Sequence, residues 1–253
     1  MQQPNSRVTP LAKPASVTIV AALLICAAGA WLLTIQQAGG MGMAGMAMLT
    51  AGLFLITWLV MMVAMMFPSV APMTLAFASV TRSRGESYVP TAAFVLGYIA
   101  VWAVTGLVPL AVADAVDQVW MTPPSWLPRA GGAVIVLAGI YQFTPLKDTC
   151  LSACRSPLGF VMTHNFGAGA PAAVRAGASH GLYCLGCCWP LMAVLAVLGL
   201  MNVAWMAVIA AIFFVEKNVR RGELLPRAVG ATCIAAGLAV MAWPNLLAGS
   251  SAM

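Results

Sequence analysis

The sequence predicts an all-α, polytopic transmembrane bundle of about seven helices with its N-terminus in the cytoplasm. Of its 253 residues, 62% are hydrophobic and only 7% are charged. A soluble domain carries about a quarter charged residues, and a disordered chain needs low hydrophobicity, so both classes are excluded. We expect one transmembrane domain over residues 16–247, between a cytoplasmic tail at 1–15 and a short tail at 248–253.

Apolar runs long enough to cross about 30 Å of hydrocarbon define the expected helices. They lie near residues 16–35, 52–79, 91–112, 130–146, 180–199, 200–216 and 228–247. Residues 1–30 could alternatively be a cleaved signal peptide. The apolar run continues through Ile35 without a polar cleavage region, which favours a retained helix. The short connection at 199–202 makes the fifth and sixth helices a tight hairpin.

Basic residues give the predicted orientation, because Lys and Arg concentrate in cytoplasmic loops. With seven crossings, only Arg129 of the 12 Lys and Arg residues falls outside. The inside residues are Arg7, Lys13, Arg82, Arg84, Lys147, Arg155, Arg175, Lys217, Arg220, Arg221 and Arg227. We therefore attribute the net charge of +6 to topology in a lipid bilayer and not to a nucleic-acid partner.

Five of the seven cysteines gather at one predicted depth on the cytoplasmic side. Cys150 and Cys154 follow the fourth span, and they share a face if that stretch is helical. Cys184, Cys187 and Cys188 stand at the predicted start of the fifth span. Their spacings fit known metal-ligand pairs, and they also fit a redox dithiol. The two remaining cysteines stand alone in apolar spans and are interpreted as packing residues.

The fifth span carries further candidate ligands. At helical pitch, His180 falls within an arc of about 60° with Cys184 and Cys187. Cys188 lies on the flank of this face, and Met192 lies one turn deeper.

The second span concentrates methionines. Met61 and Met65 are four residues apart, as are Met62 and Met66, so each pair lies on one helix face. Met73 lies on the same face as Met62 and Met66. Two prolines in this stretch free backbone carbonyls that must be covered in a membrane, so we expect the helix to face the bundle centre. Thioether pairs can relay a soft ion, and methionine can equally serve as a packing residue that needs no ion.

Other motifs restrict the function. The chain has no phosphate-binding loop and no hydrolase signature, so no ATP engine or enzyme active site is recognisable. Glu216 and Lys217 close the sixth span, where we expect an ion pair at the membrane surface. His164 lies in a cytoplasmic connection, where a solvated side chain is expected.

Three segments together carry a family resemblance. They are the Met-Met-Val-Ala-Met-Met-Phe-Pro-Ser run at 61–69, the stretch from Tyr141 to Pro157, and the His-Gly-Leu-Tyr-Cys-Leu-Gly-Cys-Cys-Trp run at 180–189, followed by Glu216-Lys217. Over roughly residues 50–220 the chain resembles a bacterial family of unknown function described as predicted metal-binding integral membrane proteins. The resemblance implies metal binding in a bacterial inner membrane, with copper handling as the theme.

The ligand types favour copper, because thiols and thioethers suit Cu(I). We expect a Cu(I)-binding protein that transports copper or hands it over, from an outer-face cluster at Met41, Met43, Met46 and Met48 to the cytosolic cysteines. Its expected partners are copper-donor or copper-acceptor proteins. The predicted site comprises Cys150, Cys154, Cys184 and Cys187. The alternatives are a thiol–disulfide redox carrier and a structural zinc scaffold, in which zinc joins the same cysteines.

Overall fold

The computed structural model describes residues 13–40, 51–112, 125–163, 167–200, 202–219 and 224–243, and regular structure in this part is helical throughout. The helices are α1 (Lys13–Gly40), α3 (Ala51–Ser83), α4 (Val89–Thr105), α6 (Leu127–Tyr141), α7 (Pro145–Arg155), α8 (Pro157–Thr163), α9 (Ala170–Leu198), α10 (Val203–Asn218) and α11 (Leu224–Ala242). The predicted all-α class is confirmed. The predicted outer Met cluster and His164 lie outside the described residues.

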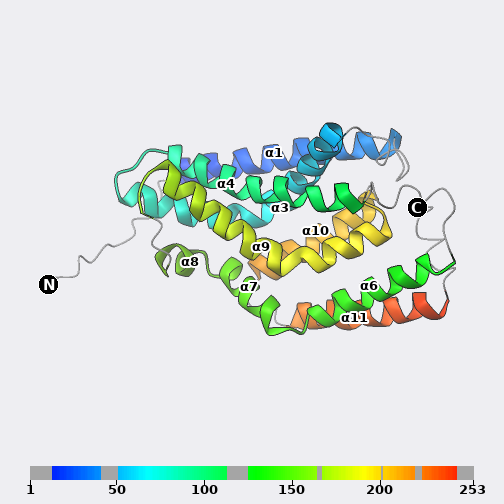
Figure 1. Cartoon of the computed structure of the whole chain (residues 1–253). Coiled ribbons are helices and arrows are strands. Elements are labelled where there is room, and N and C mark those ends of the chain that lie inside the picture. Colours follow the sequence, from blue (N-terminus) through cyan, green and yellow to red (C-terminus); the bar gives the residue numbers. More distant parts are fainter. Residues whose placement is uncertain are drawn as a thin grey trace.

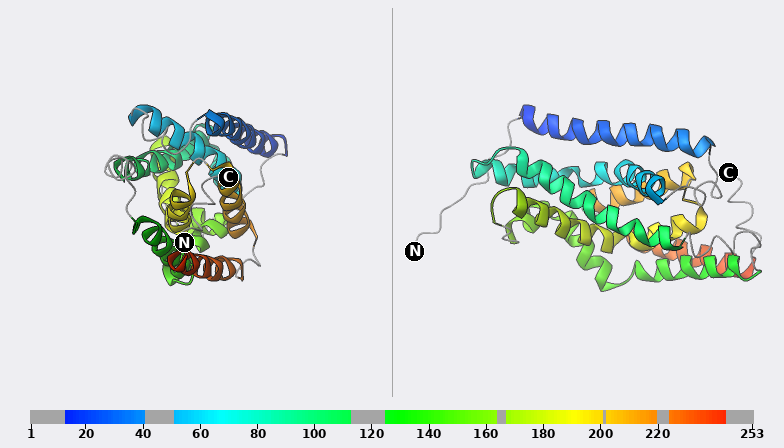
Figure 2. Two further views of the ribbon diagram at one scale, coloured as in Figure 1. Left: turned by 90° about the vertical axis from the view of Figure 1, so that its right-hand side faces the viewer. Right: turned by 45° about the horizontal axis from the view of Figure 1, so that its top comes forward.

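The long helices lie side by side along one direction (Figure 1). Helices α1, α3 and α4 form one side, α9 and α10 lie in the middle, and α6 and α11 pair on the opposite side (Figure 2). By length and composition, five helical segments of the described chain can cross a membrane: Pro14–Ala38, Ala51–Ser83, Val89–Val112, Ala170–Leu198 and Leu224–Ala242. Helix α6 is apolar but shorter.

Helix α3 is the most buried of these five segments. It continues through Pro68 and Pro72, and its methionines lie in the core, as expected for a helix at the bundle centre. Trp58 of α3 donates from Nε1 to the Trp102 carbonyl of α4 at 2.8 Å, so the two helices are joined by a buried hydrogen bond as well as by packing.

Helices α4 and α9 cross at very close range. At both Gly97 of α4 and Gly177 of α9, an added Cβ would collide with backbone atoms of the other helix. Small residues at such crossings allow apolar helices to pack in lipid, where van der Waals contact replaces the hydrophobic effect. This contact fixes the position of α9, which carries three of the cysteines.

Two predicted boundaries are wrong. The fourth span ends at Tyr141, and Pro145 then starts α7, whose N-cap Thr144 accepts a hydrogen bond from the Lys147 amide. Helix α9 begins at Ala170, about three turns before the expected start at residue 180. The expectation failed because residues 170–179 are small and include a charge, so hydropathy is low where contact with α4 favours the helix.

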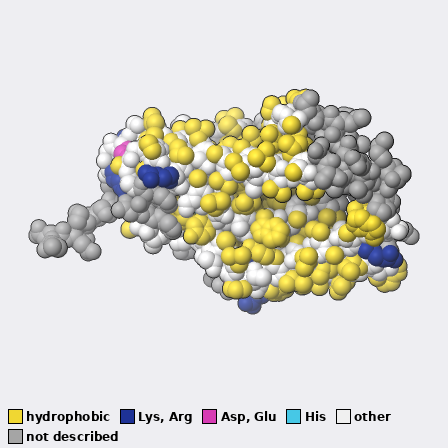
Figure 3. All heavy atoms as spheres, viewed as in Figure 1, with side chains coloured by type: hydrophobic (Ala, Val, Ile, Leu, Met, Phe, Trp, Pro, Cys, Tyr) yellow, Lys and Arg dark blue, Asp and Glu magenta, His cyan; other side chains and the backbone are white. Residues whose placement is uncertain are grey.

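Large apolar side chains are exposed along the flanks of the bundle (Figure 3). On this face the Lys and Arg side chains lie at the two ends and along the lower edge, and the apolar atoms cover the stretch between them (Figure 3). An apolar girdle between charged ends is the surface expected of helices that contact lipid.

Candidate functional site

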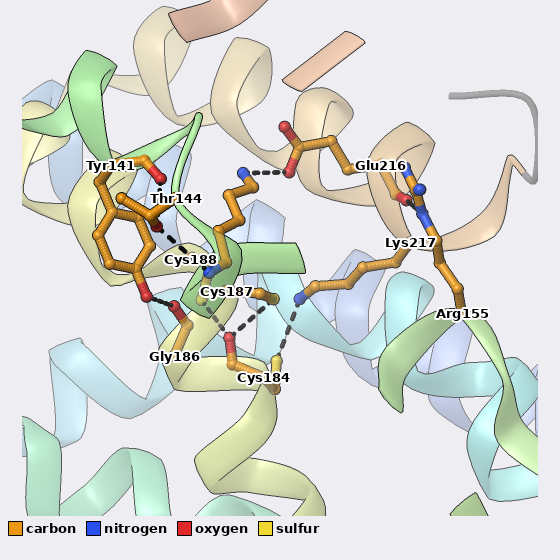
Figure 4. A network of polar contacts seen from close by, with 10 residues as sticks. Tyr141, Thr144, Arg155, Cys184, Gly186, Cys187, Cys188, Glu216 and Lys217 are labelled. Carbon is orange, nitrogen blue, oxygen red and sulfur yellow. Dashed lines mark hydrogen bonds and ion pairs between the residues drawn. The ribbon is translucent and has the colours of Figure 1, made fainter. Parts of the chain in front are cut away.

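The cysteines of α9 lie halfway along the helix, level with the ends of its neighbours. Tyr141, the last residue of α6, donates its hydroxyl to the Gly186 carbonyl at 2.7 Å. Lys217, in the last turn of α10, reaches Cys184 (Figure 4). The expectation that these cysteines start a helix is therefore wrong, although they do lie beside the ends of α6 and α10.

Cys184 is the centre of the polar network. Its Sγ accepts a hydrogen bond from the Lys217 ammonium at 3.1 Å, and the Tyr98 hydroxyl lies 3.1 Å from the same sulfur. An ammonium at this distance favours negative charge on the sulfur by Coulomb attraction, which is strong away from water. The surroundings of Cys184 therefore favour a thiolate, which is the form of cysteine that binds soft metals.

Two further thiols of α9 point at the same residue. Cys187 and Cys188 donate from Sγ to the Cys184 carbonyl, at 3.1 and 2.9 Å. All three cysteines are buried. The two hydrogen bonds orient both thiols toward the Cys184 backbone. The two thiols are thus held within one turn of Cys184.

Helix α7 brings the second cysteine pair against α9, and its helical conformation confirms that Cys150 and Cys154 can share a face. Cys154 interacts with the thiols of Cys184 and Cys187, and these hydrogen bonds, with burial, hold the pKa of Cys154 well above its usual value. Burial and the neighbouring Cys187 raise the pKa of Cys150. Both α7 cysteines are therefore protonated thiols at neutral pH.

Gly186 is needed for this approach of the two helices. A Cβ at Gly186 would lie 2.6 Å from the Cys150 sulfur. Cys150 thus packs directly on the α9 backbone between Cys184 and Cys187, and glycine is the residue that leaves room for it.

Glu216 and Lys217 do not form the predicted surface ion pair. Both are buried, and they point in different directions (Figure 4). The Glu216 carboxylate binds the Lys147 ammonium at 2.8 Å, and Arg155 donates to the Glu216 backbone carbonyl at 2.6 Å. The prediction failed because residues adjacent on a helix project about 100° apart. Buried ionisable groups in a membrane bundle usually mark function.

The remaining α9 candidates have different surroundings. His180 is buried one turn before Cys184, among the rings of Phe94, Tyr98 and Phe160, with centroids 6.1, 5.9 and 5.4 Å away. Its Nδ1 has no hydrogen-bond partner among the described residues. Met192 is buried one turn beyond Cys188. His180 therefore lies at the edge of the thiol cluster, within an aromatic box.

The methionine-rich helix leads to the same ammonium. Met66 Sδ accepts from Lys217 Nζ at 3.6 Å, so Met66 and Cys184 contact one nitrogen. Met62, one turn before Met66, is also fully buried, and so are Met61, Met65 and Met73. The structure brings Met66 to the ammonium that also contacts Cys184, and it buries all five methionines in the core.

Tyr98 and Lys147 were not recognised from the sequence. The only available signal was a polar or charged group within or beside an apolar run, which is costly unless paired. Within the described residues, no three side chains of His, Cys, Asp or Glu are arranged to hold a metal ion together. The soft donors in this region are the thiols around Cys184 and the Met66 thioether, which contacts the same ammonium as Cys184, and this donor chemistry suits Cu(I).

Comparison with known proteins gives one relationship. No curated protein and no solved structure matches the chain. The sequence model of a family described as PpoB2, copper chaperone, matches residues 55–240, which include every residue of the thiol cluster. The chain therefore belongs to the PpoB2 copper chaperone family.

Proposed function

We propose that this protein binds Cu(I) in a bacterial inner membrane and hands it over through the thiol cluster centred on Cys184. Membership of a copper chaperone family supports copper as the cargo. The observation that carries the proposal is the set of contacts at the Cys184 sulfur. This sulfur meets an ammonium, a phenol and the Cys154 thiol, all of them buried.

The proposed ligands come from two helices that are distant in sequence. The proposed ligands are drawn from Cys184 and Cys187 of α9 and Cys154 of α7, any two of which can hold the ion, and Cys150 and Cys188 complete the cluster. Cu(I) needs as few as about two soft ligands, and thiolates bind it more strongly than thioethers do. His180 and Met192 lie at the margin of this site and serve as further donors during exchange.

The proposed path runs along α3. Met62 and Met66 stand one helical turn apart, and Met66 contacts the same ammonium as Cys184. An ion moving from thioether to thiolate passes from weaker to stronger soft ligands, so the transfer needs no ATP. The proposed path also includes three further methionines of α3, Met61, Met65 and Met73. The copper ion is proposed to enter at Met41, Met43, Met46 and Met48.

The direct test is Cu(I) affinity of the purified full chain, titrated against a coloured Cu(I) chelator. Cys184→Ser, alone or with Cys187→Ser, should weaken binding at least about tenfold, because the ion loses a charged soft ligand. The matched control is Cys233→Ser, a partly buried cysteine of α11 that none of the hydrogen bonds of the cluster reaches. This control should bind as tightly as the parent.

Equal affinity in the parent and in the variant lacking Cys184 and Cys187 would show that the site is elsewhere. The same preparation also tests the redox alternative. A reversible disulfide that forms without copper, in protein that binds no Cu(I), would favour a thiol–disulfide carrier.

A further inference from the structure

The Lys217 ammonium has unusual partners for a buried cation. Among the described residues it contacts the Cys184 sulfur at 3.1 Å, the Met66 sulfur at 3.6 Å and the face of the Phe213 ring, 5.3 Å from its centroid. Buried lysines normally pair with carboxylates. The adjacent carboxylate, Glu216, instead binds Lys147.

The buried Lys and Glu charges around the cluster therefore separate into two groups. Lys147 and Glu216 neutralise each other at 2.8 Å. The Lys217 ammonium has sulfur atoms and no carboxylate among its described contacts. The thiol cluster therefore contains one fixed positive charge before a metal ion binds. A buried charge without a counter-charge has a high free energy. The cluster therefore binds best those ions that leave the Lys217 charge compensated.

We infer that Lys217 makes the cluster selective for monovalent soft cations over divalent ones. This inference rests on the proposed copper site. A monovalent ion held by two thiolates carries one net negative charge, which the Lys217 ammonium cancels. A divalent ion held by the same thiolates is neutral, and the ammonium then remains buried without a counter-charge. Cu(I) and Ag(I) therefore suit the cluster, whereas Zn(II) leaves it with a positive charge.

The geometry supports a role for the charge itself. The ammonium lies between a thioether and a thiol, so an ion that binds these sulfurs will sit beside it. At this range, and away from water, one charge changes binding much more than a surface charge does. Lys217 thus acts as a specificity residue that does not bind the metal.

The test compares Ag(I), a redox-inert monovalent probe, with Zn(II) on the full chain in detergent. The measured quantity is the ratio of the two dissociation constants, determined by competition with chelators. Lys217→Met and Lys217→Gln remove the charge, and Lys217→Arg keeps it. In both neutral variants, we expect the preference for Ag(I), measured as this ratio, to fall at least about tenfold. In the arginine variant the ratio should stay within about threefold of the parent value.

Because a ratio is measured within one folded preparation, loss of some protein to misfolding does not change it. An unchanged ratio in either neutral variant would overturn the inference and leave the copper site intact. A parent protein that binds Zn(II) as tightly as Ag(I) would overturn it without any variant. Failure of the parent to bind either Ag(I) or Cu(I) would instead overturn the proposed function, and this inference with it.

Discussion

Replacing Lys147 with methionine should destabilise the bundle strongly. The Lys147 and Glu216 side chains are 0% and 2% exposed and meet at 2.8 Å. The second carboxylate oxygen, Oε1, has no hydrogen-bond partner among the described residues, so Lys147 is the main compensation for this charge. Breaking a buried pair from one side costs about 3–5 kcal/mol, because the remaining charge is left uncompensated.

The double variant Lys147→Met/Glu216→Leu separates loss of the pair from loss of packing. Replacing both partners with apolar residues is often neutral or stabilising, so most of the lost free energy should return. Asp148→Asn is the neighbouring control, because Asp148 is exposed in the first turn of α7, where removing its charge should cost at most about 1 kcal/mol.

The assay is unfolding of the detergent-solubilised protein with increasing SDS, followed by far-UV circular dichroism. The single Lys147 variant should lose several times more unfolding free energy than the control. A loss below about 1 kcal/mol in the single variant, or an equal loss in single and double variants, would refute the argument that the pair compensates a buried charge.

Three other predictions concern copper and topology. Met62→Leu/Met66→Leu preserves volume and should cost under about 1.5 kcal/mol, so Cu(I) binding should persist while copper movement across proteoliposomes is lost; unchanged movement would exclude the relay. Because hydrogen bonds and burial hold the pKa of Cys154 high, and burial that of Cys150, Cu(I) must displace protons there. Affinity should therefore rise with pH, by up to about tenfold per unit for each displaced proton, and Cys154→Ser should flatten this slope. Ser152→Cys, exposed on α7, should react with an impermeant thiol reagent in inverted vesicles; rapid labelling in intact cells would contradict the predicted cytoplasmic location.

The periodic parts of the sequence were informative about both fold and site. Apolar runs predicted the all-α class and the hairpin of α9 and α10, and the prolines and methionines of α3 predicted its central position. The i, i+4 spacing of Cys150 and Cys154 predicted a shared face, and α7 is helical there. These features depend on local sequence and on the helical period, so they can be recognised without a structure.

Features that depend on contacts between distant segments were not predicted. Glu216 lies next to Lys217 in sequence but binds Lys147, 69 residues away, because α7 docks beside the end of α10. Tyr98 reaches Cys184 only because glycines let α4 and α9 approach closely. The early start of α9 has the same origin, since its first turns are favoured by packing against α4 more than by hydropathy.

X-ray absorption at the copper edge of the Cu(I)-loaded full chain tests the central claim most directly. The parent protein should show a first shell of sulfur at thiolate distances, as expected for an ion held by Cys184 and its neighbours. Cys184→Ser/Cys187→Ser should bind less copper and lose that sulfur shell, while Cys233→Ser should match the parent. A first shell of nitrogen or oxygen in the parent, or the same sulfur shell in the double variant, would contradict a copper site centred on Cys184.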